Sequence, residues 1–390
     1  MQVIAEIQAG QDELTAWRRH LHSHPELAYE EVQTAEFVAQ KLDAWGLRVH
    51  RGLATTGVIG TLERGAGRRV GLRADMDALP IHEANTFEHR SRHDGKMHAC
   101  GHDGHTAMLL GAARYLAEHG RFEGTIQFIF QPAEEAAGGA KVMIDEGLFE
   151  TFPVDAVFGM HNWPGLDAGR FAMRTGPMMA SMDCFDMEIQ GHGAHGALPH
   201  NGVDPVAAAA QVISALQTVV SRNVNPLEAA VISVTKIHGG DAHNVIPDIV
   251  QLGGAIRCFD DELRAFLCRR VVEVANGVCE ALGATIVVNF NSGYPAVKNW
   301  PEQTELAASV ATAIVGEQNV DAASLPVMVS EDFAFMLKEK PGCYVFIGNG
   351  AGEGACMIHN PDYDFNDAIL PLGSTYWVRL AESFLGVSSR

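Results

Sequence analysis

The sequence lacks the features that would place it in a membrane or on nucleic acid. No apolar run reaches the roughly 18–20 residues that a membrane-spanning helix needs. Basic residues are scarce, because 28 lysines and arginines stand against 48 acidic residues and give a formal net charge of −20. Binding to nucleic acid requires a basic surface that neutralises phosphates. We therefore expect neither a membrane nor a nucleic-acid partner.

Cysteine is also scarce, and its spacing excludes a disulfide framework. The 7 cysteines are odd in number, scattered and never spaced Cys-x-x-Cys, which fits a reducing compartment. The first residues, Met1 to Glu6, show no basic segment followed by an apolar core, as a secretory signal would. We expect a cytoplasmic protein whose thiols are mostly buried.

Histidine, by contrast, is abundant and clustered. Of the 18 histidines, His98, His102 and His105 lie within eight residues of the chain, together with Cys100. Imidazole and deprotonated thiol groups ligate borderline divalent metals. The stretch lies in an expected loop, where functional groups are often held. It indicates part of a metal site, whose other ligands must come from distant segments.

The first part of the chain alternates between strand and helix patterns. Apolar, β-prone runs cover 58–62, 69–73, 125–130 and 156–160, and helical spacing separates or flanks them. This order predicts an α/β fold with a mostly parallel sheet and helices on its faces. After residue 297 the same pattern returns, with expected strands that include 327–330.

A different pattern occupies the middle of the chain. Between 184 and 295 the expected order is strand, helix, strand, strand, helix, strand, which is the ferredoxin-like arrangement. Such a unit is self-contained. We therefore expect an inserted α+β domain at 184–296 within a catalytic domain formed by 1–183 and 297–390.

Polar side chains follow three of the expected parallel strands. Asp75 and Asp77 follow one strand, Glu134 and Glu135 another, and His161 a third. In parallel sheets, ligands bind at the carboxyl ends of the strands. We therefore expect these side chains to meet at one edge of the sheet.

The candidate metal ligands mix thiol, imidazole and carboxylate groups. They are Cys100, His102, Glu134, Glu135, His161 and His359. This mixture suits zinc, manganese, cobalt or nickel better than magnesium or calcium. Six candidates exceed what one tetrahedral ion needs. Two divalent ions would use five of them and leave one carboxylate free to take a proton from metal-held water.

Five ordered motifs carry a family resemblance. They are Arg73-Ala74-Asp75-Met76-Asp77-Ala78-Leu79-Pro80, His98-Ala99-Cys100-Gly101-His102-Asp103-Gly104-His105, Gln131-Pro132-Ala133-Glu134-Glu135, Gly159-Met160-His161-Asn162 and Met357-Ile358-His359-Asn360-Pro361. The chain resembles the amidohydrolase subgroup of the aminoacylase-type metallopeptidases, over about 12 to 385. That subgroup includes hippurate hydrolases, N-acyl-amino-acid amidohydrolases and plant auxin-conjugate hydrolases. The resemblance implies a metallohydrolase catalytic domain with a dinuclear metal site and an inserted ferredoxin-like dimerisation domain.

The resemblance also assigns roles in the catalytic domain. It implies that the metal ligands are Cys100, His102, Glu135, His161 and His359. Glu134 would be the general base. Asp75 stands where the wider family carries a metal-binding histidine, so the chain departs from the wider pattern but keeps to its subgroup, and Asp77 would support the site. From the residues alone, His98 and His105 read as supporting groups rather than ligands.

In the inserted domain the resemblance points to three residues. His195, in a Gly-rich loop, would reach the active site of the partner subunit in a homodimer and bind the oxyanion. Asn244 and Arg257 would hold a substrate carboxylate, which the planar fork of arginine suits. By residue type alone, four other histidines compete with His195, and a cross-strand salt bridge is the alternative reading of Arg257. The competing histidines are His192, His200, His238 and His243.

The expected function is metal-dependent hydrolysis of the amide bond of N-acyl or N-aroyl amino acids. The substrate is a small molecule, and the products are a free amino acid and a carboxylic acid. A metal-dependent dipeptidase or aminopeptidase of the same family is the alternative. A metal-storing protein would leave Glu134 without a role, and a cysteine protease built on Cys100 is a weaker reading. Ser330-Glu331-Asp332 reads either as a helix N-cap or as a segment near the substrate pocket.

Overall fold

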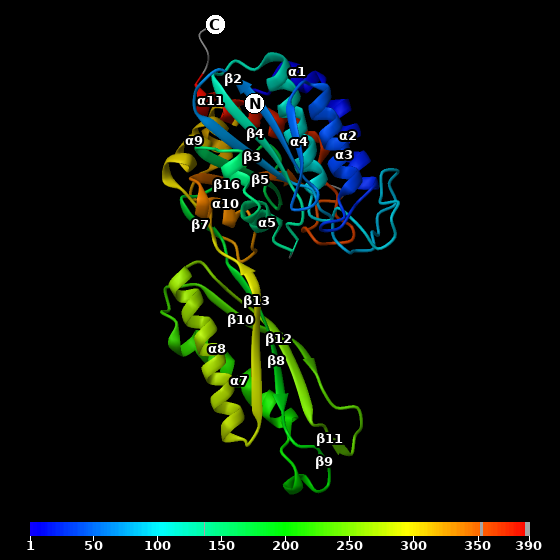
Figure 1. Ribbon diagram of the computed structural model, residues 1–390, viewed down its shortest axis with the longest axis vertical. Coiled ribbons are helices and arrows are strands. Elements are labelled where there is room, and N and C mark those ends of the chain that lie inside the picture. The colour runs from blue at the N-terminus through cyan, green and yellow to red at the C-terminus, as the bar shows by residue number, and fades with distance from the viewer. Residues whose placement is uncertain (136, 352–353, 387–390) are drawn as a thin grey trace. The chain divides into compact units, whose positions relative to one another are not determined.

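The computed structural model describes residues 1–135, 137–351 and 354–386 of the chain (Figure 1). The chain folds as two compact units. Unit 1 consists of Met1–Met178, Lys298–Leu325 and Asp332–Arg390, and unit 2 of Met179–Val297 and Pro326–Glu331. The chain leaves unit 1 through β7 (Gly176–Met179) and returns through β14 (Val297–Asn299). Among the described residues, no helix has the length and apolar character to cross a membrane.

Unit 1 is built on a sheet of eight strands in the order β1-β2-β4-β3-β5-β16-β6-β15. The strands are β1 (Arg48–Leu53), β2 (Gly57–Arg64), β3 (Arg69–Asp75), β4 (Gly124–Gln131), β5 (Ala156–Pro164), β6 (Phe171–Ala172), β15 (Val320–Asp321) and β16 (Gly342–Gly350). The neighbours β4, β3, β5 and β16 run parallel to one another, whereas β2 and β6 flank them antiparallel. The expected α/β fold with a mostly parallel sheet is confirmed.

The central parallel strands are buried along almost their whole length. Every residue of β16 is buried, and so are all but the first of β3 and all but the second of β4. Parallel strands read as continuous apolar runs because helices cover both faces of the sheet. The helices of unit 1 are α1 (Ala5–Ala9), α2 (Gln11–Ser23), α3 (Val32–Ala44), α4 (His102–His119), α5 (Gly139–Asp145), α6 (Leu148–Thr151), α9 (Pro301–Val315), α10 (Ala334–Glu339) and α11 (Leu370–Leu385).

The helix α4 is the centre of the helical layer. It packs against α2, α11 and the strand β3, and almost all of its first four turns are buried (Figure 1). A helix that is buried on all sides has no polar face to expose. Its polar residues near the start, His102, Asp103 and His105, are therefore inside the protein, where each needs a partner.

Unit 2 has the ferredoxin-like order that the sequence predicts. Its elements are β8 (Met182–Gln190), α7 (Pro205–Asn223), β10 (Ala230–His238), β12 (Ile249–Cys258), α8 (Asp261–Ala281) and β13 (Thr285–Tyr294). The antiparallel sheet has the order β10-β12-β8-β13, and alternate residues of β8, namely Phe185, Met187 and Ile189, share a core with the two helices. A small ribbon of β9 (Ala194–His195) and β11 (Val245–Ile246) extends from it.

The segment 327–330 differs from expectation, because it forms no strand of the unit 1 sheet. It belongs to unit 2, where the carbonyls of Val327 and Val329 both accept the N–H of Ala180, at 3.1 and 2.9 Å. The carbonyl of Met328 accepts Nη1 of Arg257 at 2.8 Å. Its carbonyls are thus satisfied without a regular ladder.

Candidate metal centre

The predicted residues of unit 1 meet at the carboxyl ends of β3, β4 and β5. Asp75 is the last residue of β3, Glu134 and Glu135 follow β4, and His161 lies near the end of β5. β3 pairs in parallel with both other strands, so their carboxyl ends share one edge of the sheet. The helix α4 begins at the same edge with His102.

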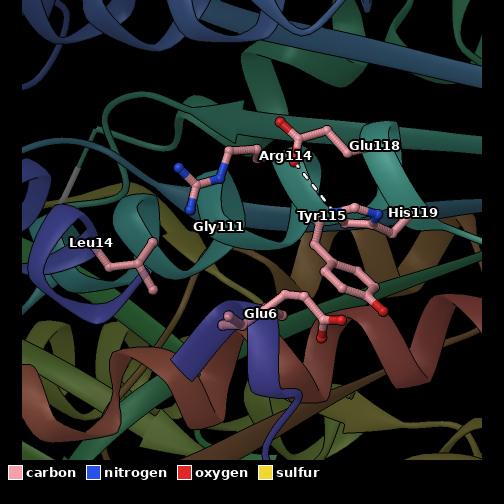
Figure 2. Close-up of a pocket in the computed structure, with 8 residues that line it drawn as sticks. Glu6, Leu14, Gly111, Arg114, Tyr115, Glu118 and His119 are labelled. Carbon is pink, nitrogen blue, oxygen red and sulfur yellow. Dashed lines mark ion pairs between the residues drawn. The ribbon is translucent and has the colours of Figure 1, made fainter. Parts of the chain in front are cut away.

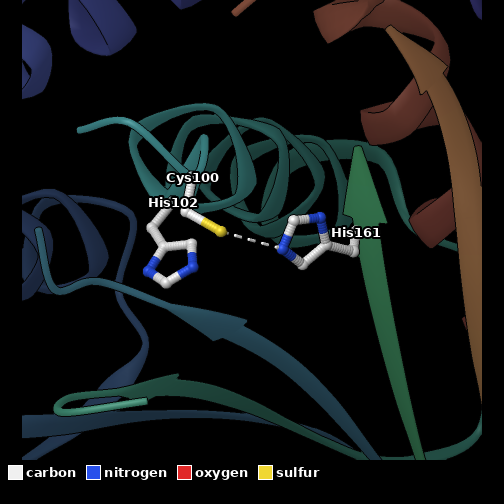
Figure 3. A group of neighbouring side chains, drawn as sticks. All are labelled: Cys100, His102 and His161. Atoms are coloured by element: carbon white, nitrogen blue, oxygen red, sulfur yellow. Dashed lines mark hydrogen bonds between the residues drawn. The ribbon is translucent and has the colours of Figure 1, made fainter. Parts of the chain in front are cut away.

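A glycine turn aims Cys100 and His102 at the same point. Gly101 between them has φ +97°, and a Cβ there would lie 2.3 Å from Oδ1 of Asn162. Only glycine adopts this backbone without strain and fits this space. The Sγ of Cys100 lies 3.4 Å from Nε2 of His161, and Figure 3 shows the sulfur between the two imidazole rings.

Hydrogen bonds to one ring nitrogen leave the other facing the site. Nδ1–H of His161 donates to the carbonyl of Asn162 at 2.6 Å. Nδ1 of His102 lies 2.9 Å from the carbonyl of Asp77 and 3.1 Å from its carboxylate. Backbone and carboxylate partners of this kind fix the tautomer of a ligating histidine. The Nε2 lone pairs of both rings are therefore available to a metal ion.

A loop after β4 supplies the carboxylates. Ala133 has φ +57°, and this bend precedes Glu134 and Glu135. The N–H of Glu135 donates to Oδ2 of Asp77 at 2.9 Å, and its Oε1 lies 3.1 Å from Nε2 of His359. His359 also has positive φ, +65°, and its N–H donates to the carbonyl of Ala99 at 2.7 Å. Both loops are thus tied to the strand and turn that carry the other candidates.

All six candidate ligands converge. Their donor atoms form three overlapping groups, each with all atoms within 4.8 Å of one another. The groups are Cys100 with His102 and His161, Cys100 with Glu135 and His359, and His102 with Glu134 and Glu135. Because Cys100 and His102 each belong to two groups, the arrangement offers adjacent positions for more than one ion. Which residue ligates and which acts as base stays a prediction.

The residues present fit a divalent metal. Nε2 of His102 is buried and has no hydrogen-bond partner among the described residues. An unpaired buried polar atom is costly unless an ion or water satisfies it. Burial lowers the pKa of His102, but the carboxylates of Asp75 and Asp77 outweigh it and raise that pKa to about 10. The site therefore favours a positive charge at this ring, as a proton or as a metal.

Asp75 lies beside the candidate ligands, and both of its carboxylate oxygens are hydrogen-bonded. Its Oδ1 accepts Nδ1–H of His105 at 2.6 Å and its Oδ2 accepts Nη1 of Arg73 at 2.6 Å. Burial alone would raise the pKa of the carboxyl, but His102, Arg73 and His105 together hold it well below its usual range. Nε2 of His105 accepts the N–H of Asn162 at 3.0 Å, which agrees with a supporting role for this histidine.

Two buried carboxylates near the site, Asp332 of the Ser330-Glu331-Asp332 segment and Glu31, have partners that the sequence does not indicate. Asp332 accepts hydrogen bonds from Arg73 at 3.1 Å, from Gln131 at 2.9 Å and from the N–H of Ala140 at 2.9 Å. It thus joins β3, β4 and α5, while α10 begins at Ala334 with Phe333 as its N-cap. Glu31 accepts the N–H of Ala133. No spacing in the sequence pairs these residues, because their partners are distant.

The predicted residues of unit 2 fall into two places within that unit. His195 in β9 pairs with Val245 of β11, and the carbonyl of Asn244 accepts the N–H of Gly196 at 2.8 Å. Nδ1 of His195 accepts the N–H of Ala197 at 3.1 Å, so a neutral ring carries its proton on Nε2. The ring is exposed and presents a donor.

Arg257, on β12, is held by uncharged groups. Its Nη1 donates to the carbonyl of Met328, and burial lowers the pKa of the guanidinium. In the described part of the chain its hydrogen-bond partners lie on Met328, Ser330 and Met182, none of which is a carboxylate, so the reading as a cross-strand salt bridge is wrong.

A cavity of about 110 Å³ lies elsewhere in unit 1, at the far end of α4 (Figure 2). Its lining includes Glu6, Arg114, Tyr115 and His119. His102 begins α4 and His119 ends it, so the cavity is separate from the candidate metal centre.

Comparisons with known proteins agree on one family. A sequence model of peptidase family M20/M25/M40 matches residues 71–383. The chain is 42% identical over 386 residues to the hippurate hydrolase of Campylobacter jejuni. This match covers 99% of this chain and 100% of that protein. It is 46% identical over 293 residues to the N-acyl-L-amino acid amidohydrolase of Geobacillus stearothermophilus, over 74% of this chain and 79% of that protein.

A solved structure supports the same grouping. The YxeP protein of Bacillus subtilis, described as a dinuclear metal binding peptidase of the M20 family, superimposes with a TM-score of 0.83 and 36% identity. The match covers 97% of this chain and 99% of that one.

Proposed function

The chain belongs to peptidase family M20/M25/M40, and on this premise we propose that it is an amidohydrolase that cleaves the amide bond of N-acyl or N-aroyl amino acids. The products are a free amino acid and a carboxylic acid. The observation that carries this proposal is the convergence of six donor residues, one more than two ions need, at one edge of the sheet. Similarity to the hippurate hydrolase and to the N-acyl-L-amino acid amidohydrolase supports the substrate class.

The metal ions are divalent, and the proposed ligands are Cys100, His102, Glu135, His161 and His359. Zinc, manganese, cobalt and nickel all suit this donor set. Bound at these residues, two such ions would polarise the substrate carbonyl and lower the pKa of a water. The description of the YxeP protein as dinuclear supports two ions.

Glu134 is the proposed general base. Its side chain is buried, and its Oε1 accepts the N–H of Asp332 at 3.3 Å. This contact holds one oxygen in place. A carboxylate fixed in this way takes the proton from the attacking water and then delivers it to the leaving amine.

Unit 2 supplies the remaining roles in this proposal. Nε2–H of His195 donates to the oxyanion that develops on the substrate, in a homodimer in which the partner subunit's His195 completes each site. Asn244 and Arg257 bind the substrate carboxylate. Support for the donor role comes from the N–H of Ala197, which occupies Nδ1 of His195 and leaves the proton on Nε2.

A cytoplasmic location completes the proposal. All seven cysteines, each within the described residues, are free, which fits a reducing compartment.

Replacing Glu134 by Gln tests the function. We expect kcat for N-benzoylglycine and N-acetyl amino acids to fall roughly 10²- to 10⁴-fold, because the general base is lost. Metal content should stay that of the wild type, since five ligands remain. A Glu118→Gln variant, at the far end of α4, should keep full activity. Unchanged hydrolysis by Glu134→Gln would overturn the base assignment. Preferential cleavage of dipeptides in the same substrate panel would favour a dipeptidase over a hydrolase of N-acyl amino acids.

A further inference from the structure

A short segment between α2 and α3 reaches the loop that carries the two glutamates. We call residues 132–135 and 137–138 the glutamate loop. Glu31, at the end of the segment, is buried, and its Oε1 accepts the N–H of Ala133 at 2.9 Å. Its Oε2 accepts the hydroxyl of Thr56 at 2.6 Å. Both oxygens of this carboxylate are therefore occupied, and one of them holds the glutamate loop.

The contact falls on a residue of the loop whose backbone needs support. Ala133 has φ +57°, a conformation that strains a non-glycine residue and persists only where the surroundings enforce it. The N–H of Gly139 donates to the carbonyl of Ala133 at 2.9 Å, so the turn is closed on its other side as well. A Cβ at Gly139 would lie 1.8 Å from the carbonyl oxygen of Pro132.

This turn matters because of the residues that follow it. Adjacent side chains on an extended segment point to opposite sides. Here the donor oxygens of Glu134 and Glu135 both lie within 4.8 Å of His102. The bend at Ala133 is what permits both carboxylates to face one site.

Tyr29, on the same segment, holds the other end of the loop. Its hydroxyl donates to the carbonyl of Ala137 at 2.9 Å, and its own φ is +64°. The segment therefore touches the glutamate loop before Glu134 and after Glu135.

Stability does not account for Glu31. Burial raises the pKa of its carboxyl, the hydrogen bonds from Thr56 and Ala133 lower it in part, and the negative charge of Asp77 raises it, so that it lies at about 7. Tyr29, Asp77 and Glu146, which lie near this segment, bring no positive charge, and Lys96 pairs with the neighbouring Glu30, at 2.7 Å, rather than with Glu31. Burying a carboxylate among acids costs stability, and residues of this kind are expected where function requires them.

We propose that Glu31 is a positioning residue for hydrolysis, which holds the bend at Ala133 and thereby sets the carboxylate of Glu134 against the metal-held water. This inference rests on the proposed role of Glu134. What the bend requires of Glu31 is an acceptor oxygen at the N–H of Ala133 and not a negative charge. Tyr29 assists by holding the loop at Ala137.

A pair of substitutions of nearly equal volume tests the proposal. Glu31→Met removes both acceptors, whereas Glu31→Gln keeps one for Ala133 and can donate to Thr56. At pH 8, with metal-loaded full-length enzyme, we expect Glu31→Met to lower kcat roughly 10- to 100-fold, because small misplacements of a catalytic group have such effects. KM and metal content should stay within about threefold of wild type. Glu31→Gln should retain kcat within about threefold.

Glu26→Gln is the matched control. Glu26 is also a buried carboxylate of the same segment, but its oxygens accept the N–H groups of Gln33 and Thr34 at the start of α3. This variant should keep kcat. If Glu31→Met keeps kcat, or if Glu31→Gln loses as much as Glu31→Met, the proposal is overturned.

Two further variants keep the result decisive. If Glu31→Met does not fold, Tyr29→Phe decides: a severalfold fall in kcat at constant KM supports the proposal, and an unchanged kcat rejects it. Glu134→Gln separates the two hypotheses. An active Glu134→Gln enzyme means that the proposed role of Glu134 as base has failed, whereas an inactive one beside a fully active Glu31→Met enzyme rejects the positioning role of Glu31 alone.

Discussion

The Sγ of Cys100 and Nε2 of His161 lie 3.4 Å apart in the interior of unit 1. In a cysteine nucleophile, an imidazole in this position lowers the pKa of the thiol. Here burial and the carboxylates of Glu135 and Glu134 raise the pKa of the Cys100 thiol well above its usual value. Burial also holds the pKa of His161 well below its usual range. A pair of neutral groups is a poor nucleophile and base, but both offer lone pairs to a metal ion.

Removing the metal should therefore abolish activity, while blocking the thiol should not. We expect EDTA to inactivate the enzyme, and added Mn²⁺, Zn²⁺, Co²⁺ or Ni²⁺ to restore hydrolysis of N-acyl amino acids. Iodoacetamide should leave the metal-loaded enzyme active, because Cys100 is buried. Activity that survives dialysis against EDTA but not alkylation would favour a thiol mechanism instead.

Substituting Gly101 should weaken metal binding as well as lower the stability of the protein. Gly101→Ala places a Cβ 2.3 Å from Oδ1 of Asn162 and 2.8 Å from the hydroxyl of Tyr363. Because Cys100 and His102 flank this turn, we expect metal affinity to fall roughly 10- to 100-fold. Competition with a chromogenic chelator measures it.

Gly46 provides the matched control for that substitution. It has φ +79°, similar to the +97° of Gly101, but a Cβ there meets nothing within 4 Å. Gly46→Ala should lower the free energy of unfolding by about 1–2 kcal/mol and leave metal affinity unchanged. Equal metal affinities in the two variants would show that the close contacts at Gly101 do not matter.

The contact of His22 with Asp103, in the first turn of α4, should make the stability of the protein depend on pH. Nδ1–H of His22 donates to Asp103 at 2.8 Å and Nε2–H donates to Glu83 at 3.0 Å. Burial lowers the pKa of His22, but these hydrogen bonds outweigh it and raise that pKa to about 9. Since the unfolded value is lower, near 6.5, this stabilisation is complete below about pH 6.5 and is lost as the pH rises through about 9.

His22→Gln tests this linkage. At pH 6 we expect the substitution to lower the free energy of unfolding by roughly 1–3 kcal/mol, because it leaves the buried Asp103 with only Arg18, at 3.8 Å, and removes the cation of the half-buried Glu83. The difference from wild type should shrink as the pH approaches 10. Urea unfolding at both values measures it, with the exposed His119→Gln as control. A difference that does not change with pH would contradict the raised pKa of His22.

His195 should affect the chemical step, and it should do so in the active site of the partner subunit. We expect His195→Ala to lower kcat by about 10²- to 10³-fold, the effect of losing one oxyanion donor. Mixing His195→Ala with Glu134→Gln subunits should restore activity, because hybrid dimers would contain one site with both residues intact. A fully active monomer in sedimentation analysis would rule out the contribution in trans.

Much of the candidate centre was predictable, because its signals are local in the sequence. Three of its residues each lie at or near the carboxyl end of a short apolar strand: Asp75 ends β3, Glu134 follows β4, and His161 lies near the end of β5. The parallel fold then brings strand ends together, so the convergence of these residues follows from topology. The segment 327–330 was wrongly expected to be a strand, since the carbonyls of Val327 and Val329 both accept the single N–H of Ala180 and form no regular ladder.

The tertiary structure alone decided how those residues are held. Arg73 meets Asp332 across 259 positions of sequence, and Glu31 meets Ala133 across 102. The choice of ring nitrogen at His161 and His102 likewise depends on a neighbouring carbonyl. Residue type and spacing determine which groups can bind a metal or carry a proton. Their orientation and pKa depend on burial and on single hydrogen bonds between distant segments, which no local pattern records.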